Sequence, residues 1–188
     1  YSARIDMEIR RFELSFKDLP KGLKGFKIVQ ISDAHIGPFF SLHRLDETIE
    51  LIRVEKPDMV VITGDLIDDL TLLSSCVEKL SQLSQVVPYG IYFCWGNHEY
   101  FRDIKRIRKE LLSSPIHILE NNHAPISVGG SKFYLLGVDY PSAKTIPEKN
   151  KQQQHFLAKA QENIPSGAFQ ILLAHHSDFL FNAFDAQI

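Results

Sequence analysis

Apolar segments typical of buried strands alternate with amphipathic helical segments through the first half of this chain. Residues 26–31 and 59–63 are rich in β-branched residues, and residues 90–95 form a third apolar run. Between the first two runs, Ser41 can cap a helix in which leucine and isoleucine recur every three or four residues. Leucines at similar spacing fill residues 72–83. Crossovers of this length join parallel strands, so the pattern predicts an α/β or mixed fold containing a parallel sheet.

Shorter elements follow and precede this region. Residues 5–9 alternate apolar and polar residues, which predicts a strand with one covered face that Leu14 and Phe16 extend. Gly129 and Gly130 join two strand-like segments, as in a β-hairpin. The other expected elements are helices at 104–112 and 152–161, hairpin strands at 124–128 and 132–138, and a last apolar strand at 169–174.

Composition excludes several classes of protein. The 188 residues suit one domain, and 44% apolar against 23% charged residues is the balance of a soluble globular chain. A net charge of −2 gives no electrostatic basis for binding duplex nucleic acid. Cys76 and Cys94 cannot form a disulfide framework, so we expect both to be buried apolar residues. No membrane-spanning run or signal peptide is visible, so we expect this chain itself to be soluble.

Polar side chains suited to metal binding follow four of the expected strands. Thirty-two positions separate Asp33 from Asp65, and again Asp65 from Asn97. Because the carboxyl ends of parallel strands meet at one edge of a sheet, we expect these side chains to share a site there. In extended backbone Asp33 and His35 would also point to one face and hold one ion. The full set is Asp33, His35, Asp65, Asn97, His98 and His175.

The ligand types in this set favour particular metals. Carboxylate, imidazole and amide oxygen, with no thiolate, suit Mn, Fe or Zn. A carboxylate such as Asp65 can bridge two cations, with one oxygen on each. Two ions about 3.5–4 Å apart can bind a phosphate between them and generate a hydroxide.

The ordered motifs resemble those of the calcineurin-like metallophosphoesterases. DAH at residues 33–35, GDLID at 64–68, GNHE at 96–99 and the single His175 match the family patterns DxH, GDxxD, GNH(D/E) and a lone histidine. The resemblance runs from Phe26 to the end of the chain. It is strongest to a bacterial branch whose members are commonly tethered to a membrane by N-terminal segments, which implies membrane association through residues preceding this chain.

The resemblance implies a fold and a set of metal ligands. The expected fold is a four-layer αββα sandwich, with two sheets face to face and helices outside. By motif matching, Asp33 and His35 bind the first divalent ion, Asp65 bridges both, and Asn97 and His175 bind the second. His175 is preferred to His176 because it directly follows the expected strand.

The same resemblance gives roles to three residues that are not expected to be ligands. His98 is expected to face the substrate, where it stabilises the phosphoryl oxygens or protonates the leaving group. Glu99 is expected to orient His98, and Asp68 is expected to support the ligands from behind.

One family motif is missing. The family completes its two metal shells with Gly-His-x-His, which this sequence does not contain. Residues 186–188 look like the strand that leads into it. We therefore expect residues 1–188 to form one catalytic domain cut short at its C-terminus, with the second sheet incomplete and the parent protein continuing.

The function implied is hydrolysis of a phosphate ester, most simply a diester, by a hydroxide that bridges two metal ions. One alternative is a non-catalytic scaffold of the same fold that binds protein partners. Another is a pyrophosphatase acting on a nucleotide-linked lipid. Phe39 and Phe40 could form an apolar lip for an acyl chain or membrane surface, or pack beneath their loop. A basic helix follows His98, and it could attract an anionic headgroup or form a solvated face; its residues are Arg102, Lys105, Arg106, Arg108 and Lys109.

Overall fold

Two β-sheets form the centre of the molecule. We describe residues 8–188 of a computed structural model of the chain. The first sheet contains four parallel strands in the order β1-β2-β3-β4. In the second sheet β5 and β6 are antiparallel and β7 is parallel to β6. The strands are β1 (Ile28–Ile31), β2 (Met59–Thr63), β3 (Ile91–Cys94), β4 (Ile116–Ile118), β5 (Asn122–Val128), β6 (Ser131–Gly137) and β7 (Gln170–Leu173).

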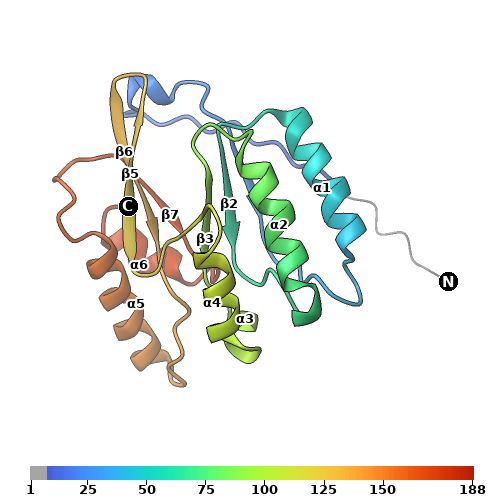
Figure 1. Cartoon of the computed structure of the whole chain (residues 1–188). Coiled ribbons are helices and arrows are strands. Elements are labelled where there is room, and N and C mark those ends of the chain that lie inside the picture. The colour runs from blue at the N-terminus through green and yellow to red at the C-terminus, as the bar shows by residue number, and fades with distance from the viewer. Residues whose placement is uncertain (1–7) are drawn as a thin grey trace.

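Helices cover the outer faces of both sheets (Figure 1). The helices α1 (Leu42–Glu55), α2 (Leu73–Ser84) and α4 (Ile104–Leu112) pack on the first sheet, and α5 (Ile146–Ala160) and α6 (Phe179–Asp185) on the second. A short helix, α3 (Asn97–Phe101), and two 3-10 turns, η1 (Lys21–Leu23) and η2 (Leu70–Leu72), lie in the connections.

Alternating side chains of the strands build two cores against the first sheet. In β2, Val60 and Ile62 face the helices, whereas Met59 and Val61 face the second sheet. Phe133 and Leu135 of β6 meet them across the interface between the sheets. A third core joins the outer face of β6 to α5 and α6. The layers are therefore helix, sheet, sheet, helix, and the expected four-layer sandwich is confirmed.

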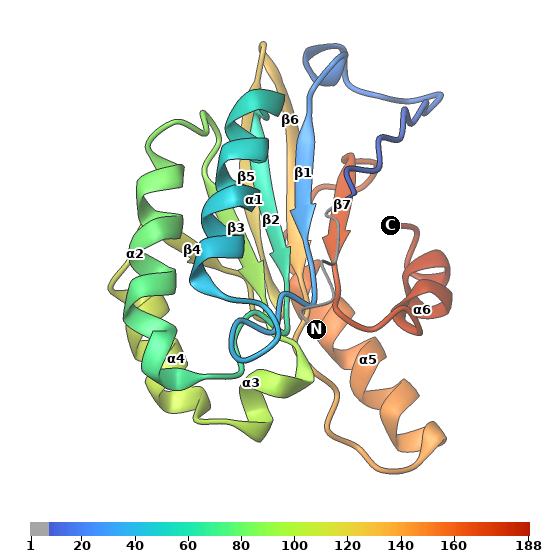
Figure 2. The same ribbon diagram turned by 90° about the vertical axis from the view of Figure 1, so that its right-hand side faces the viewer.

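The carboxyl ends of four strands lie at the same end of the sandwich. Figure 2 shows the arrowheads of β1, β2, β3 and β7 all pointing toward the end at which α3 lies. Three of these strands belong to the first sheet and β7 to the second. We expected all four loops at the edge of one sheet. That expectation is wrong for the loop after β7, which reaches the site from the second sheet.

Several local expectations are confirmed. The Ser41 hydroxyl accepts a hydrogen bond from the backbone of Arg44, so it caps α1. Both hairpin glycines have positive φ, 54° at Gly129 and 79° at Gly130, as a two-residue turn between twisted strands requires. Cys76 and Cys94 are fully buried, and burial raises the pKa of the Cys76 thiol to about 12.

Other expectations are wrong or fall outside the described residues. The expected strand at residues 5–9 lies largely in the undescribed segment, and Leu14 and Phe16 are exposed in irregular chain rather than in a strand. Residues 186–188 form a turn after α6, in which the Ile188 backbone N–H donates to the carbonyl of Ala183. The chain turns there because α6 already buries Phe179 and Ala183 at helical spacing.

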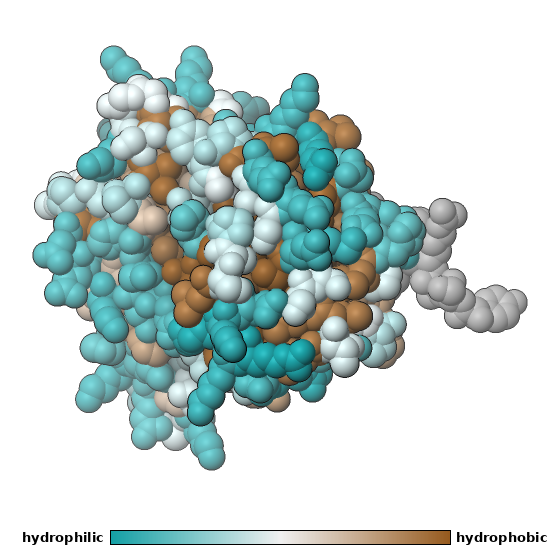
Figure 3. All heavy atoms as spheres, viewed as in Figure 1, coloured by the Kyte–Doolittle hydropathy of each residue, from teal (hydrophilic) through white to brown (hydrophobic). Residues whose placement is uncertain are grey.

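Much of the view in Figure 3 is hydrophilic, with hydrophobic residues exposed between the outer elements. Within residues 8–188, no helix has both the length and the apolar character needed to cross a bilayer.

Candidate metal centre

Backbone hydrogen bonds tie together the loops that follow β1 and β2, and side chains join the loops after β3 and β7 to them. The backbone N–H of Asp33 donates to the carbonyl of Gly64 over 3.2 Å, and that of His35 to the carbonyl of Asp65 over 2.9 Å. The loop after β7 joins them through the His175 ring, whose Nδ1 lies 2.8 Å from the Thr63 carbonyl oxygen. These contacts bring together side chains that are far apart in sequence.

Two glycines allow the close approach of these loops. A Cβ at Gly96 would overlap Asp65 Oδ1 and lie 2.6 Å from the Asp65 backbone nitrogen. A Cβ at Gly64 would lie 2.6 Å from Gly96 Cα and 3.0 Å from His175 Nδ1. The glycines that precede Asp65 and Asn97 are therefore needed for space, and Gly64 also for its φ of +80°.

Strained backbone is concentrated at the site. Asp33, His35 and Asp65 have φ of 53°, 44° and 53°, the left-handed region that non-glycine residues rarely adopt. They are three of seven such residues in the described part of the chain. The expectation of extended backbone between Asp33 and His35 is therefore wrong. Left-handed turns, held by the hydrogen bonds to the neighbouring loop, direct the side chains together instead.

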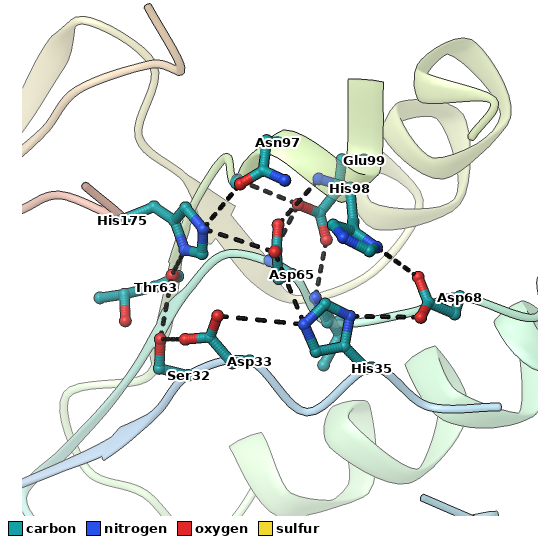
Figure 4. A network of polar contacts seen from close by, with 12 residues as sticks. Ser32, Asp33, His35, Thr63, Asp65, Asp68, Asn97, His98, Glu99 and His175 are labelled. Atoms are coloured by element: carbon teal, nitrogen blue, oxygen red, sulfur yellow. Dashed lines mark hydrogen bonds and ion pairs between the residues drawn. The ribbon is translucent and has the colours of Figure 1, made fainter. Parts of the chain in front are cut away.

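The first group of candidate ligands contains Asp33, His35 and Asp65 (Figure 4). His35 Nε2 lies 4.0 Å from Asp33 Oδ1 and 3.6 Å from Asp65 Oδ2. The Ser32 hydroxyl donates to the other oxygen of Asp33. The ligand atoms of this group all lie within 4.8 Å of one another, a spacing that one cation can draw together.

The second group contains Asp65, Asn97 and His175. His175 Nε2 lies 3.4 Å from Asp65 Oδ2 and 3.1 Å from Asn97 Oδ1. A carbonyl oxygen can only accept, so His175 Nδ1 must carry the proton donated to Thr63. In neutral His175 the lone pair of Nε2 then faces two other acceptor atoms. Three acceptors directed at one another fit a bound cation, because without one only an added proton relieves their repulsion.

Ionisation of the metal-free site reflects the same arrangement. The Asp65 carboxylate, helped by the Thr63 carbonyl, raises the pKa of His175 to about 9 despite burial. Burial works to raise the pKa of Asp65, but hydrogen bonds from His175 and from the His98 backbone hold it below its usual value. Asp65 is thus ionised in the metal-free site, as a carboxylate must be to bind a metal ion.

The two carboxylate oxygens of Asp65 have different partners. Oδ1 accepts the backbone N–H of His98 over 2.8 Å. Oδ2 is therefore the oxygen that faces both His35 and His175. This differs from the expectation of one oxygen on each ion, because the start of α3 occupies Oδ1.

Asp68 contacts two imidazole rings. Its Oδ1 lies 2.7 Å from His98 Nδ1, and its Oδ2 lies 3.2 Å from His35 Nδ1. These contacts direct the Nε2 atoms of both rings away from Asp68. Arg102 also reaches Asp68 Oδ1 at 3.2 Å. His35, Asp68 and His98 are themselves close enough to be a rival ion-binding group.

Glu99 acts on the backbone and not on the His98 ring. It is fully buried, and its carboxylate accepts backbone N–H groups of Asp65, Leu66 and Gly96 over 2.7–3.0 Å. Burial raises its pKa, although these donors favour the ionised form. The expectation that Glu99 orients His98 is therefore wrong; it fixes the loops after β2 and β3.

The structure also places the neighbouring residues for which the sequence left alternatives open. His176 Nε2 is buried without a hydrogen-bond partner, and its ring packs on Tyr140 and not on Asp65. Trp95 is buried, as expected, and its Nε1–H donates to Glu120. Phe40 packs against the first core, whereas Phe39 is 90% exposed.

The basic residues after His98 do not form one free face. Arg108 pairs with Glu120 and lies over the Trp95 ring at 4.7 Å. Arg106 donates to the carbonyl of Leu70, and Arg102 reaches Asp68. These arginines support the loops around the site.

Sequence reasoning did not identify three contributors: Ser32, the Thr63 carbonyl and the contact between Arg102 and Asp68. Only Ser32, adjacent to Asp33, carried a signal in the sequence.

Comparisons with known proteins identify the family of the chain. Residues 26–184 match the model of the calcineurin-like phosphoesterase family. A Bos taurus transmembrane protein with a metallophosphoesterase domain is 32% identical over 171 residues, covering 87% of this chain and 38% of that protein. An uncharacterized metallophosphoesterase of Bacillus subtilis is 29% identical over 163 residues, covering 85% of this chain and 54% of that protein.

The NAD nucleotidase of Haemophilus influenzae has a similar fold. Its structure gives a TM-score of 0.51 at 18% identity, covering 83% of this chain and 39% of that one. The chain belongs to the calcineurin-like phosphoesterase family, and it carries that family's metallophosphoesterase domain. It spans between about a third and about a half of the length of the two relatives described here. One of these relatives is an animal protein and the other is bacterial.

Proposed function

We propose that the protein is a phosphodiesterase that works with two divalent ions. In this proposal Asp33 and His35 hold one ion, Asn97 and His175 hold the other, and Asp65 bridges them. His98 faces the substrate. Asp68 positions the His35 and His98 rings, and Glu99 positions the loops after β2 and β3.

The observation that carries the proposal is the position of Asp65 Oδ2. This oxygen lies 3.6 Å from His35 Nε2 and 3.4 Å from His175 Nε2, and hydrogen bonds keep the carboxylate ionised. One anionic oxygen therefore faces two imidazole nitrogens from opposite loops. A pair of ions bound there would satisfy both imidazoles, and Asp33 and Asn97 would complete the two sides.

Divalent ions bound there would acidify a water molecule and offset the negative charge that grows on the phosphoryl oxygens. The chain's own residues do the rest. Asp68 accepts a hydrogen bond from the Nδ1–H of His98, which leaves His98 Nε2 available to the substrate. A protonated Nε2 can then give its proton to the departing oxygen.

Replacing His98 by Ala separates the role at the substrate from the role of a ligand. We expect turnover of an aryl phosphodiester to fall about 100-fold or more, since general acid catalysis contributes this much. Metal content measured by mass spectrometry should stay near that of the wild type. Asp65→Asn should instead lower occupancy of both sites together. Loss of metal from His98→Ala would contradict the assignment.

The substrate test compares this chain with its reading frame extended beyond Ile188, each supplied with Mn²⁺ and an aryl phosphodiester. Hydrolysis by either protein supports the proposal that the protein is an enzyme. Metal binding without hydrolysis of diesters, monoesters or pyrophosphates would favour the non-catalytic scaffold.

We also propose that the protein acts at a membrane through segments preceding this chain, on a lipid- or nucleotide-linked phosphoester. The Bos taurus relative is named as a transmembrane protein, which supports the location. Fractionation of cells with and without detergent tests it, and recovery of the full-length protein without detergent would contradict it.

A further inference from the structure

A continuous series of aromatic rings borders the candidate metal centre. The His98 ring lies 5.7 Å from Phe101, and Phe101 lies 6.4 Å from Tyr140. Tyr140 lies 5.3 Å from His176, which lies 5.2 Å from His175. The series therefore runs from the residue proposed to face the substrate to a proposed metal ligand.

Phe101 is exposed although it lies at the edge of the site. It is the last residue of α3, three positions after His98, and 63% of its surface is accessible. Its ring is not part of the buried cores. This large ring contacts the histidine proposed to face the substrate, yet it is open to solvent. A ligand that covers the ring would be bound more tightly, because burying apolar surface is favourable.

The backbone of the neighbouring aromatic residue, Tyr140, is held by a partly buried frame of polar groups. The Tyr100 hydroxyl lies 2.7 and 2.8 Å from the two carboxylate oxygens of Asp139. Asp139 Oδ1 accepts the Tyr140 backbone N–H over 2.7 Å, and the Asp139 N–H donates to Asn121 Oδ1 over 2.9 Å. Because Tyr100 lies on α3 beside Phe101, this frame fixes the Tyr140 backbone relative to α3 before any ligand arrives.

The Phe101 and Tyr140 rings lie nearly perpendicular, at 80° to each other. We propose that they determine specificity for a planar aromatic group of the phosphoester, either a nucleobase or an aryl ring, which stacks on the face of one ring and meets the edge of the other. The proposal rests on the proposed function, since phosphate bound at the metal centre brings its substituent to these rings. Aliphatic side chains would serve an acyl chain as well as rings do. A perpendicular pair of rings, which offers one face and one edge, favours a planar π-system instead.

The test compares phenyl phosphate with cyclohexyl phosphate, which have the same number of carbon atoms but differ in planarity. Their dissociation constants are measured by calorimetry on the full-length protein loaded with Mn²⁺. We expect phenyl phosphate to bind at least about fivefold more tightly, the low end of base–aromatic stacking. In Phe101→Leu and Tyr140→Leu the preference should fall toward one, while inorganic phosphate binds as before.

Phe184→Leu is the matched control, because Phe184 is an exposed phenylalanine on α6 outside the ring series. It should retain the wild-type preference. Equal binding of the two ligands by a wild type that hydrolyses phosphoesters would overturn this inference and leave the proposed function intact. Equal weakening of all three ligands in Phe101→Leu would also overturn it. A wild type that neither binds phosphate nor hydrolyses phosphoesters would overturn both.

Discussion

At the scale of single residues, Asp65 has the most demanding position in the site. It is 3% exposed, has a left-handed backbone, touches the glycine of the next loop and faces two histidines. Its residue type and position could be predicted from the sequence, since it directly follows a buried strand. Its strained φ and the unequal use of its oxygens could not, because they depend on α3 and on a loop about thirty residues away.

Gly96→Ala tests whether close packing positions Asp65. The new Cβ would overlap Asp65 Oδ1, and the φ of −102° at Gly96 adds no backbone strain of its own. We expect Mn²⁺ affinity, measured by calorimetry, to fall about tenfold to 100-fold, as when residues that support ligands are changed. Gly25→Ala is the control, because its Cβ would meet no atom within 4 Å, so its effect comes from the positive φ of 78° and not from a steric contact. Equal effects of the two changes would contradict the steric argument.

His175 should make metal binding depend on pH. Its pKa is raised to about 9 in the metal-free site, so near neutral pH it is protonated and must lose that proton to become a ligand. Mn²⁺ affinity should therefore rise with pH, by up to about tenfold per unit between about pH 6 and pH 8. His175→Asn should flatten the dependence, and changing the exposed His43 to Ala should not. A flat wild-type profile would contradict this account.

At the scale of elements, α3 organises the site more than its five residues suggest. Its first residues supply Asn97 and His98, its backbone donates to Asp65, and Glu99 ties it to the loops after β2 and β3. Sequence periodicity predicted the long helices and buried strands well, and residues 104–112 match α4 in both bounds. It missed α3, β4 and α6, because elements this short have little pattern and form through tertiary contacts.

Glu99→Gln tests this role of α3. The amide keeps the size of the side chain but directs an N–H₂ group at backbone donors. We expect the free energy of unfolding of the metal-free protein to fall by about 1–3 kcal/mol, the cost of an unsatisfied buried group. Urea denaturation measures it. Glu78→Gln, at an exposed position on α2, should change it little. Unchanged stability in Glu99→Gln would show that its three hydrogen bonds contribute nothing.

At the scale of the whole molecule, the sandwich brings ligands from both sheets to one end. Three loops come from the first sheet and His175 comes from the second, across the core that contains Met59 and Leu135. The alternation of strands and helices predicted the first sheet. The resemblance of the motifs, and not periodicity, predicted that a second sheet faces it. The pairing of β7 with β6 joins strands about thirty-five residues apart, and no local pattern in the sequence specifies that register.

The most direct test of the account is the position of bound metal. Crystals of the full-length protein grown with Mn²⁺ would be measured for anomalous scattering. We predict two peaks, one among Asp33, His35 and Asp65 and one among Asp65, Asn97 and His175, with Asp65 between them. A single peak among His35, Asp68 and His98 would contradict the account, because it would make His98 a ligand and leave Asp65 without a bridging role.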